Sequence, residues 1–379
     1  MKKVICVVAA FAMVAGVATV ASAEVKLGGD ARARFRVMDD GTDGSYIKFD
    51  SRVRIKIKAS TESGAYVNAR LRFFDGTWGD GTTTTTTDEV TGVSTSVWAA
   101  DRGYSNSGSG SLTTDYGYLG FKANGFDVSA GRQMVNWSEW FAYDLRADRL
   151  KILYKTGGTT VGYTYDQVKE SFEADDEDIY KNGVLLKQKI SDTTKVAARL
   201  VHVTNDTKDT DGFVADAYAT MNFGGNNVRV EAAYKEADTI AGDDDGIGAF
   251  ASWSAAMGSV VPKVRVGITK DGYVANNQFG WLMIGDIWGT STGYSIGQGG
   301  DTMFAGVSAD FAASEKLSFQ GNAVYLDVDA DTDDTVTEIS VQASYKVIKD
   351  ASLTLRSGTL IYADSEDVFN TVLRLDVNF

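Results

Sequence analysis

The sequence predicts an all-β protein, a transmembrane antiparallel up-and-down β-barrel. Apolar and polar residues alternate with a period of two along most of the chain, which indicates strands with two unlike faces. These segments are about ten residues long, the length that a tilted strand needs to cross a bilayer. Very short joints alternate with long polar connections, which is typical of a membrane barrel with tight periplasmic turns and larger outer loops.

The composition fits this fold and identifies a targeting segment. The chain has 379 residues, a net charge of −14, 40 Gly, and one each of Pro, Cys and His. Lys2 and Lys3 precede an apolar run that ends in the small residues 21–23. We therefore expect residues 1–23 to be a signal peptide and residues 24–379 to form one barrel domain. The only cysteine, Cys6, lies in the signal peptide, so disulfides are not expected.

The C-terminal segment shows the alternation most clearly. Leu373, Leu375 and Phe379 fall on one face, and Arg374 and Asp376 fall on the other. Counting such segments predicts 18 strands, with 16 as the alternative because boundaries read from one sequence are loose. The expected strands lie near 25–38, 46–60, 64–75, 113–123, 126–134, 148–156, 159–167, 179–190, 194–205, 212–223, 226–236, 247–257, 260–270, 301–312, 315–328, 335–348, 351–362 and 367–379.

Basic residues follow the polar faces of the first three strands. A Lys or Arg in the lipid would cost roughly 2–4 kcal/mol at mid-bilayer, so these residues must face water. A barrel of 16 to 18 strands is wide enough to leave an aqueous channel. We therefore expect a pore lining made of Arg32, Arg34, Arg36, Lys48, Arg52, Arg54, Lys56, Lys58, Arg70 and Arg72.

Acidic clusters recur in the expected outer loops, and one of them resembles a calcium-binding loop. Asp327, Asp329, Asp331 and Glu338 match ligand positions 1, 3, 5 and 12 of such a loop. Thr332 stands where that motif requires Gly, and the flanking segments are strands. The simpler interpretation is a set of solvated loops. A further possibility is that divalent cations link these carboxylates to phosphates of lipopolysaccharide.

The signal peptide, the alternating strands, the Gly/Asp/Thr-rich outer loops and the terminal Phe379 resemble the Gram-negative outer-membrane general porin family. The resemblance covers about residues 24–379 and implies a channel in the cell outer membrane for passive diffusion of ions and small hydrophilic solutes. It also implies that the last strand is read by the barrel-assembly machinery, and that a homotrimer can form. In this family the third outer loop folds into the lumen and faces basic residues of the wall. The corresponding loop here, near 135–147, would carry Glu139 and Asp144, with Asp148 just after it.

Other functions are less well supported by the residues. The net negative charge disfavours nucleic acid as a partner. An outer-membrane hydrolase needs a general base, and the only histidine, His202, falls on the lipid-facing parity, so neither an enzyme nor a cofactor is expected. Two alternatives stay open. One is a barrel that sheathes a partner protein such as an electron carrier, and the other is a structural or adhesive surface protein.

Overall fold

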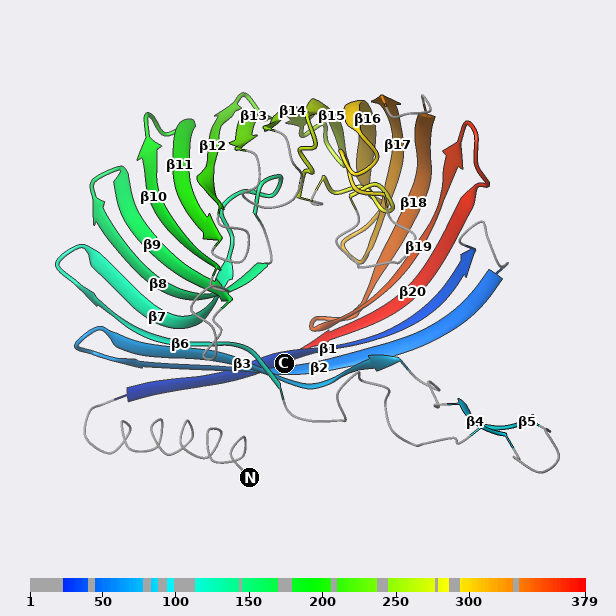
Figure 1. The fold of residues 1–379 in the computed structure, drawn as a ribbon, viewed down its shortest axis with the longest axis horizontal. Coiled ribbons are helices and arrows are strands. Elements are labelled where there is room, and N and C mark those ends of the chain that lie inside the picture. The colour runs from blue at the N-terminus through cyan, green and yellow to red at the C-terminus, as the bar shows by residue number, and fades with distance from the viewer. Residues whose placement is uncertain are drawn as a thin grey trace.

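The chain forms one closed sheet of 18 antiparallel strands and a separate two-stranded hairpin (Figure 1). The structure is a computed structural model that describes residues 23–39, 45–77, 83–87, 94–98, 113–142, 145–169, 179–205, 210–236, 245–276, 279–285, 294–329 and 334–379. The predicted signal peptide lies outside the described residues, apart from Ala23 at the start of the first strand. In the described part of the chain, no helix is long and apolar enough to span a membrane.

The barrel strands match the segments predicted from the sequence. Their bounds are β1 Ala23–Asp39, β2 Ser45–Thr61, β3 Ala65–Thr77, β6 Thr113–Ala123, β7 Phe126–Val135, β8 Leu145–Thr156, β9 Thr159–Lys169, β10 Ile179–Lys189, β11 Thr194–Asn205, β12 Thr210–Phe223, β13 Asn226–Lys235, β14 Gly246–Ala255, β15 Val260–Lys270, β16 Asp301–Ala312, β17 Leu317–Asp329, β18 Asp334–Ile348, β19 Ala351–Tyr362 and β20 Val368–Asn378. The sequence reading missed β4 (Thr83–Thr87) and β5 (Ser94–Trp98), which form the hairpin outside the barrel.

The sheet closes because the first and last strands pair with each other. Strand β1 pairs with β2 along one edge and with β20 along the other, in a register that runs from Asp30↔Asn378 to Asp39↔Phe369. Each remaining barrel strand pairs with the barrel strands before and after it in the chain. The up-and-down topology and the count of 18 are confirmed, and the alternative count of 16 is wrong. Closure leaves no strand edge, which is what a bilayer requires of a sheet.

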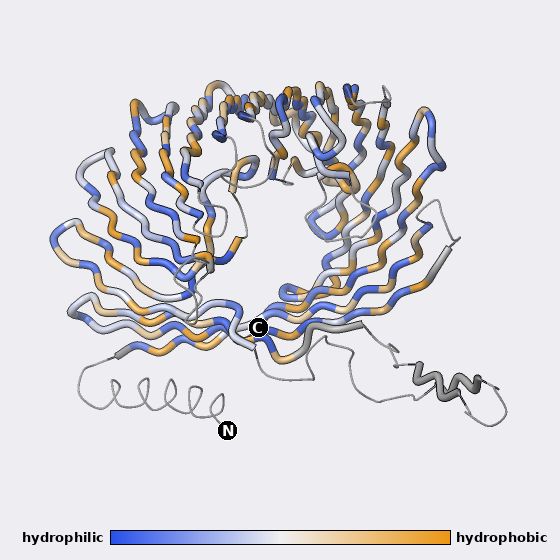
Figure 2. The backbone as a smooth tube through the Cα atoms, in the orientation of Figure 1, coloured by the Kyte–Doolittle hydropathy of each residue, from blue (hydrophilic) through white to orange (hydrophobic). Residues whose placement is uncertain are grey.

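The two faces of the wall differ as the alternation predicted. On β20, Leu373 and Leu375 are 39% and 41% exposed, whereas Asn370 and Val372 are 5% and 4% exposed. The exposed apolar side chains point away from the barrel axis, whereas the inward positions hold polar residues together with a few buried apolar ones such as Val372. Figure 2 shows the same alternation of apolar and polar positions along the other strands. The outward face is therefore a continuous apolar surface suited to lipid.

Tight turns join the strands at one rim. Asn124 and Gly125 connect β6 to β7 with φ values of 51° and 86°, the left-handed conformation that a two-residue hairpin turn requires. Such turns hold neighbouring strands in register, so that every inward residue of one strand lies beside an inward residue of the next.

The C-terminal residue packs over the seam between β1 and β20. The Gly29 amide donates to the Phe379 carbonyl oxygen at 2.6 Å, and the Phe379 amide donates to the Gly29 carbonyl oxygen at 3.2 Å. A Cβ atom at Gly29 would lie 2.5 Å from the Phe379 ring and 2.5 Å from the Arg54 carbonyl oxygen. The Phe379 ring can therefore pack against the wall because Gly29 has no side chain.

We predict that Gly29→Ala destabilises the barrel by about 1–3 kcal/mol, because the added methyl group forces Phe379 or the backbone to move. The midpoint of urea unfolding of the lipid-reconstituted protein measures this. Gly321→Ala is the matched control, because a Cβ atom at this strand glycine meets nothing within 4 Å. Equal unfolding midpoints for the two variants would contradict the proposed packing.

Candidate pore and its constriction

The ten basic residues predicted to line the pore share the inward face of β1, β2 and β3. Their cross-strand register places like charges beside each other, as in Arg36↔Lys48, Arg32↔Arg52 and Lys56↔Arg70. Lys58 lies at the turn end of this row and is exposed. The row is placed where the alternation predicted, and adjacent cations of this kind need compensation from nearby carboxylates.

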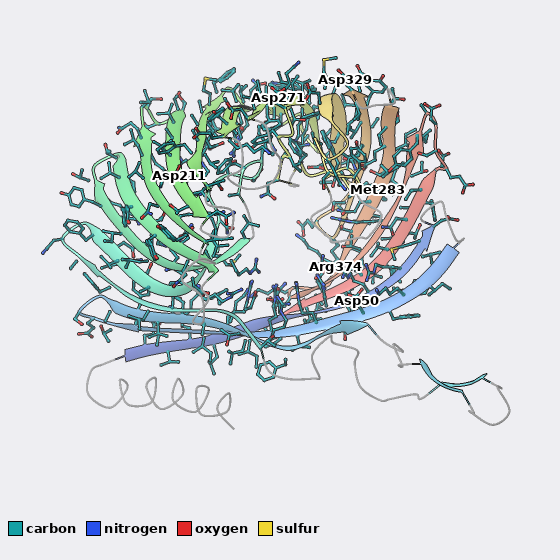
Figure 3. The ribbon with its side chains drawn as sticks, viewed as in Figure 1. Asp50, Asp211, Asp271, Met283, Asp329 and Arg374 are labelled. Atoms are coloured by element: carbon teal, nitrogen blue, oxygen red, sulfur yellow. The ribbon has the colours of Figure 1, made fainter. Side chains whose placement is uncertain are left out.

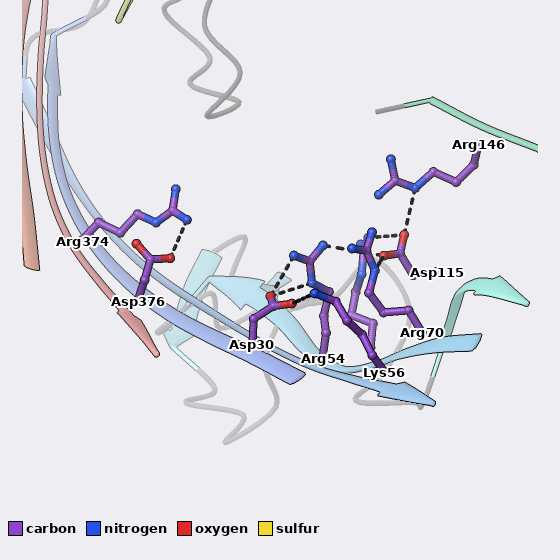
Figure 4. A network of polar contacts seen from close by, with 9 residues as sticks. Asp30, Arg54, Lys56, Arg70, Asp115, Arg146, Arg374 and Asp376 are labelled. Carbon is purple, nitrogen blue, oxygen red and sulfur yellow. Dashed lines mark hydrogen bonds and ion pairs between the residues drawn. The ribbon is translucent and has the colours of Figure 1, made fainter. Parts of the chain in front are cut away.

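Three inward aspartates partly compensate the basic row (Figures 3 and 4). The Asp50 carboxylate accepts from Arg34 Nε at 2.8 Å and pairs with Arg36 Nη2 at 2.8 Å. Asp30 pairs with Arg54 at 2.8 Å and with Lys56 at 3.4 Å. Asp115 of β6 pairs with several arginines; the contacts are to Arg70, to Arg146 at 3.0 Å, to Arg72 at 3.2 Å and to Arg54 at 3.6 Å. Cations outnumber carboxylates in this network, so the wall keeps an excess of positive charge.

The sequence reading omitted Asp30, Asp115 and Arg146 from the pore lining. Asp30 and Asp50 lie in the same parity as the arginines, so the alternation alone could have placed them there. Asp115 lies at a register shift between β3 and β6, where simple alternation fails. Arg146 follows a loop whose path the sequence does not specify.

Cations continue around the wall from β8 to β11. Arg149 makes two hydrogen bonds to the Asp166 carboxylate. Arg199 is only 8% exposed, and no carboxylate of the described residues lies within ion-pair distance of it. A cavity of 320 Å³ is lined here by Lys181, Arg199, Phe141 and Tyr273, among other residues. This cavity combines cationic groups and the Asp166 carboxylate, which Arg149 binds, with an apolar wall.

The segment after β7 folds into the barrel and packs on the wall of β12 to β14. The Trp137 indole N–H donates to Asp216, and the Ser138 hydroxyl donates to Glu231. Trp140 stacks on Phe279 with ring centroids 5.4 Å apart. Asp216 and Glu231 are inward residues, 3% and 4% exposed. The in-folding implied by the family resemblance is therefore present in this segment.

The expected acids of this loop do not face the basic row. Glu139 lies beside Trp140, Arg229 and Arg265 in a second cavity. Asp148 is a correction: it lies on the outward side of β8, its side chain is 59% exposed, and it pairs with Arg132 at 3.3 Å. The next residue, Arg149, points inward to Asp166, whereas the pair of Asp148 with Arg132 lies on the outward side. Asp144 lies outside the described residues.

A second in-folded segment comprises the described residues 271–276, 279–285 and 294–300, for which the sequence predicts only an outer loop. Phe279, Trp281, Met283 and Ile284 are at most 2% exposed, and Figure 3 shows Met283 on the inner side of the wall. Wall glycines make room for them: Gly306 lies under the Trp281 ring, and a Cβ atom at Gly358 would lie 3.0 Å from Met283 Sδ. So many large apolar residues in a connection are a signal of burial that a reading of strand periodicity overlooks.

Tyr273 also belongs to this segment and is 4% exposed. Burial raises the pKa of the Tyr273 phenol, and the charges of Asp216 and Glu231 raise it further. The phenol therefore stays neutral and serves as part of the apolar packing beside the two carboxylates.

Glu338 of β18 fixes this segment to the wall. Its carboxylate accepts the backbone N–H groups of Leu282 at 3.0 Å, Met283 at 3.1 Å and Ile284 at 2.6 Å, and it also accepts the Ser340 hydroxyl. Glu338 is 0% exposed. Without the Glu338 carboxylate, these buried N–H groups would have no acceptor, which is costly in free energy.

The same geometry corrects the calcium-site hypothesis. Glu338 points inward, whereas Asp327 and Asp329 lie on the exposed, outward parity of β17, so the three carboxylates do not meet. Asp331 lies outside the described residues. No cluster of metal-binding side chains occurs among the residues that the structure describes. The spacing along the sequence matches that of a calcium-binding loop, but the alternation of the strands places these carboxylates on opposite sides of the wall.

We predict that Glu338→Ala releases residues 279–285 from the wall and raises single-channel conductance. Each backbone N–H left without an acceptor costs about 1–3 kcal/mol, which favours detachment of the segment. Planar-bilayer recording of the purified protein measures the change, and Asp329→Ala is the control because it removes a carboxylate from the outward face. A folded Glu338→Ala barrel with unchanged conductance would show that Glu338 does not hold the constriction.

Comparisons with known proteins support the fold. Neither a family model nor a curated protein matches the sequence. Among solved structures, the chain is similar to Pseudomonas aeruginosa OccK3 (OpdO), with a TM-score of 0.65, 11% identity, and coverage of 94% of this chain and 96% of that one. For OccK8 (OprE) of the same organism, the TM-score is 0.64 at 9% identity, and the match covers 94% of this chain and 98% of that one. For OpdK, solved with vanillate, the TM-score is 0.64 at 12% identity, and the match covers 93% of this chain and 98% of that one. The chain thus has the barrel fold of these proteins over nearly its whole length.

Proposed function

We propose that the protein is an outer-membrane channel through which small hydrophilic solutes, anions above all, diffuse passively. The observation that carries this proposal is the inward row of basic residues on β1, β2 and β3, which its three aspartates only partly balance. The outward face of the same strands is apolar. Such a wall lets the barrel lie in lipid while its interior favours water and negative charge.

The in-folded segments give the channel its selectivity. They occupy the wall from β12 to β18, so a solute must pass between apolar segment surfaces and the basic row. A positive wall in a narrow, partly desolvated path lowers the energy of an anion and raises that of a cation. Size exclusion and charge together then sort the solutes without any bound cofactor.

The structural neighbours agree with this proposal. OccK3, OccK8 and OpdK of Pseudomonas aeruginosa share the barrel fold of this chain over nearly their whole length. OpdK was solved with vanillate, an organic carboxylate with an aromatic ring. The cavity beside Lys181 and Arg199 in this chain offers cations next to apolar side chains, which suits small organic acids. We therefore include such acids among the permeant solutes.

The alternative functions receive less support. The in-folded segments fill interior space that a sheathed partner protein would need. His202, at the outer end of β11, lies beside Asp211 at 3.5 Å, on the parity that faces away from the lumen. We propose no catalytic role for it. Contacts with lipopolysaccharide, recognition of β20 by the barrel-assembly machinery and a homotrimer remain proposals based on the family resemblance.

We predict that replacing Arg52, Arg54, Arg70 and Arg72 together by Gln shifts ion selectivity toward cations. The chloride-to-potassium permeability ratio should fall several-fold, because one unit charge at about 4 Å acts with about 1 kcal/mol even in water. Reversal potentials across planar bilayers under a salt gradient give this ratio.

The control removes the same total charge outside the basic row, from exposed lysines at the turn rim of the barrel. These are Lys122, Lys155, Lys189 and Lys349, each replaced by Gln. The control should leave the permeability ratio close to that of the parent protein. If the arginine variant also leaves it unchanged, the basic row does not set selectivity.

A further inference from the structure

A second cavity, here called the inner pocket, lies on the turn side of the in-folded Trp140. It has a volume of 260 Å³ and is lined by Glu139, Trp140, Arg229 and Arg265, with Ser252 and Thr220 among its wall residues. Register aligns Thr220, Arg229, Ser252 and Arg265 across four neighbouring strands, near the short turns. The inner pocket therefore lies on a different part of the wall from the basic row of β1 to β3.

Arg265 is the cation of the inner pocket that forms no ion pair with a described residue, although the charges of Glu139 and Asp310 act on it from a longer distance. Arg229 donates to Glu231 at 2.7 Å, and Lys263 pairs with Asp310. Arg265 makes one long hydrogen bond, from Nη1 to Ser308 Oγ at 3.4 Å, and no carboxylate of the described residues lies within ion-pair distance. A largely buried guanidinium of this kind favours an incoming anion, which it can bind through two parallel N–H groups.

Other groups in the inner pocket call for hydroxyl partners. Glu139 has no hydrogen bond or ion pair with any described residue, and an ionised carboxylate can only accept hydrogen bonds. Trp140 is only 2% exposed, and its indole N–H is buried without a hydrogen-bond acceptor. The hydroxyls of Thr220 and Ser252 make no hydrogen bond within the described part of the chain. Together these groups offer both acceptors and donors to a ligand that carries several hydroxyl groups.

We propose that the inner pocket is a binding subsite for a small polyhydroxylated carboxylate, the chemistry of a sugar acid. The ligand carboxylate binds Arg265, and its hydroxyls donate to Glu139 and contact Ser252, Thr220 and the Trp140 indole N–H. Glu139 in the same cavity disfavours a dianion, because a second negative charge would be repelled. The cavity is smaller than the roughly 300–1,000 Å³ of pockets for drug-sized ligands, so the ligand is a small metabolite. This inference rests on the proposed channel function and deepens it.

Calorimetric titration of the detergent-solubilised full-length barrel with sodium gluconate tests the subsite. Arg265→Gln should weaken gluconate binding about ten-fold or more, because the variant removes the charged donor that binds the ligand carboxylate. Arg374→Gln is the matched control: Arg374 is an inward arginine of β20, paired with Asp376, and its loss should leave gluconate affinity unchanged. Equal affinities in the Arg265→Gln variant and the parent would overturn the proposal.

Three further probes test the ligand chemistry. Propionate has the carboxylate without hydroxyls, glucose has hydroxyls without the carboxylate, and alanine pairs its carboxylate with an ammonium group. We expect all three to bind at least ten-fold more weakly than gluconate. The double variant Thr220→Val, Ser252→Ala removes the two pocket hydroxyls with little change in volume, and it should weaken gluconate binding while leaving propionate unaffected. Tighter binding of alanine than of gluconate would show that the pocket takes zwitterions, and would overturn the proposal.

The two proposals fail in different ways. A barrel that conducts ions with a preference for chloride but does not bind gluconate rejects the inner-pocket subsite and leaves the channel intact. A barrel that shows no conductance in planar bilayers rejects the channel function, whatever it binds.

Discussion

The alternation of two unlike faces along each strand is the constraint on which the rest of this structure depends. A strand in a bilayer must pair all its backbone groups with neighbouring strands, and closure between β1 and β20 completes this pairing around the barrel. Once the sheet is closed, side-chain parity alone decides which groups contact lipid and which contact water. The basic residues of β1 to β3 are tolerated because every one of them falls on the inward parity.

The interior is then shaped by two connections that return into the barrel. Most of their large apolar side chains gather into one cluster against the wall of β13 to β20, and Trp137 packs in a smaller cluster nearby, so the lumen is not filled evenly. Packing brings Trp140 of one segment onto Phe279 of the other, at a centroid distance of 5.4 Å. Wall carboxylates complete the attachment: Asp216 and Glu231 hold the first segment, and Glu338 holds the second. One wall of the interior is therefore largely apolar, and the facing wall is cationic.

The sequence allowed the barrel and its basic row to be predicted, since both follow from a local period of two. The failures share a cause, because they concern residues whose position depends on the path of a loop or on distant partners. Asp148 was assigned to the lumen from its nearness to the loop, but the parity of β8 turns it outward. Asp327 and Glu338 were grouped by spacing, although the strands separate them to opposite faces. The burial of Trp281 could have been predicted, because a large apolar residue in a polar connection indicates burial.

Cysteine accessibility along β20 would test the assignment of the two faces most directly. The only cysteine of the sequence is Cys6, in the predicted signal peptide, so single cysteines can be introduced without further changes. In liposomes, Arg374→Cys should react with a water-soluble, membrane-impermeant thiol reagent, and Leu373→Cys and Leu375→Cys should not. Rapid modification at positions 373 and 375 together with protection at position 374 would contradict a lipid-facing apolar surface around a watery interior.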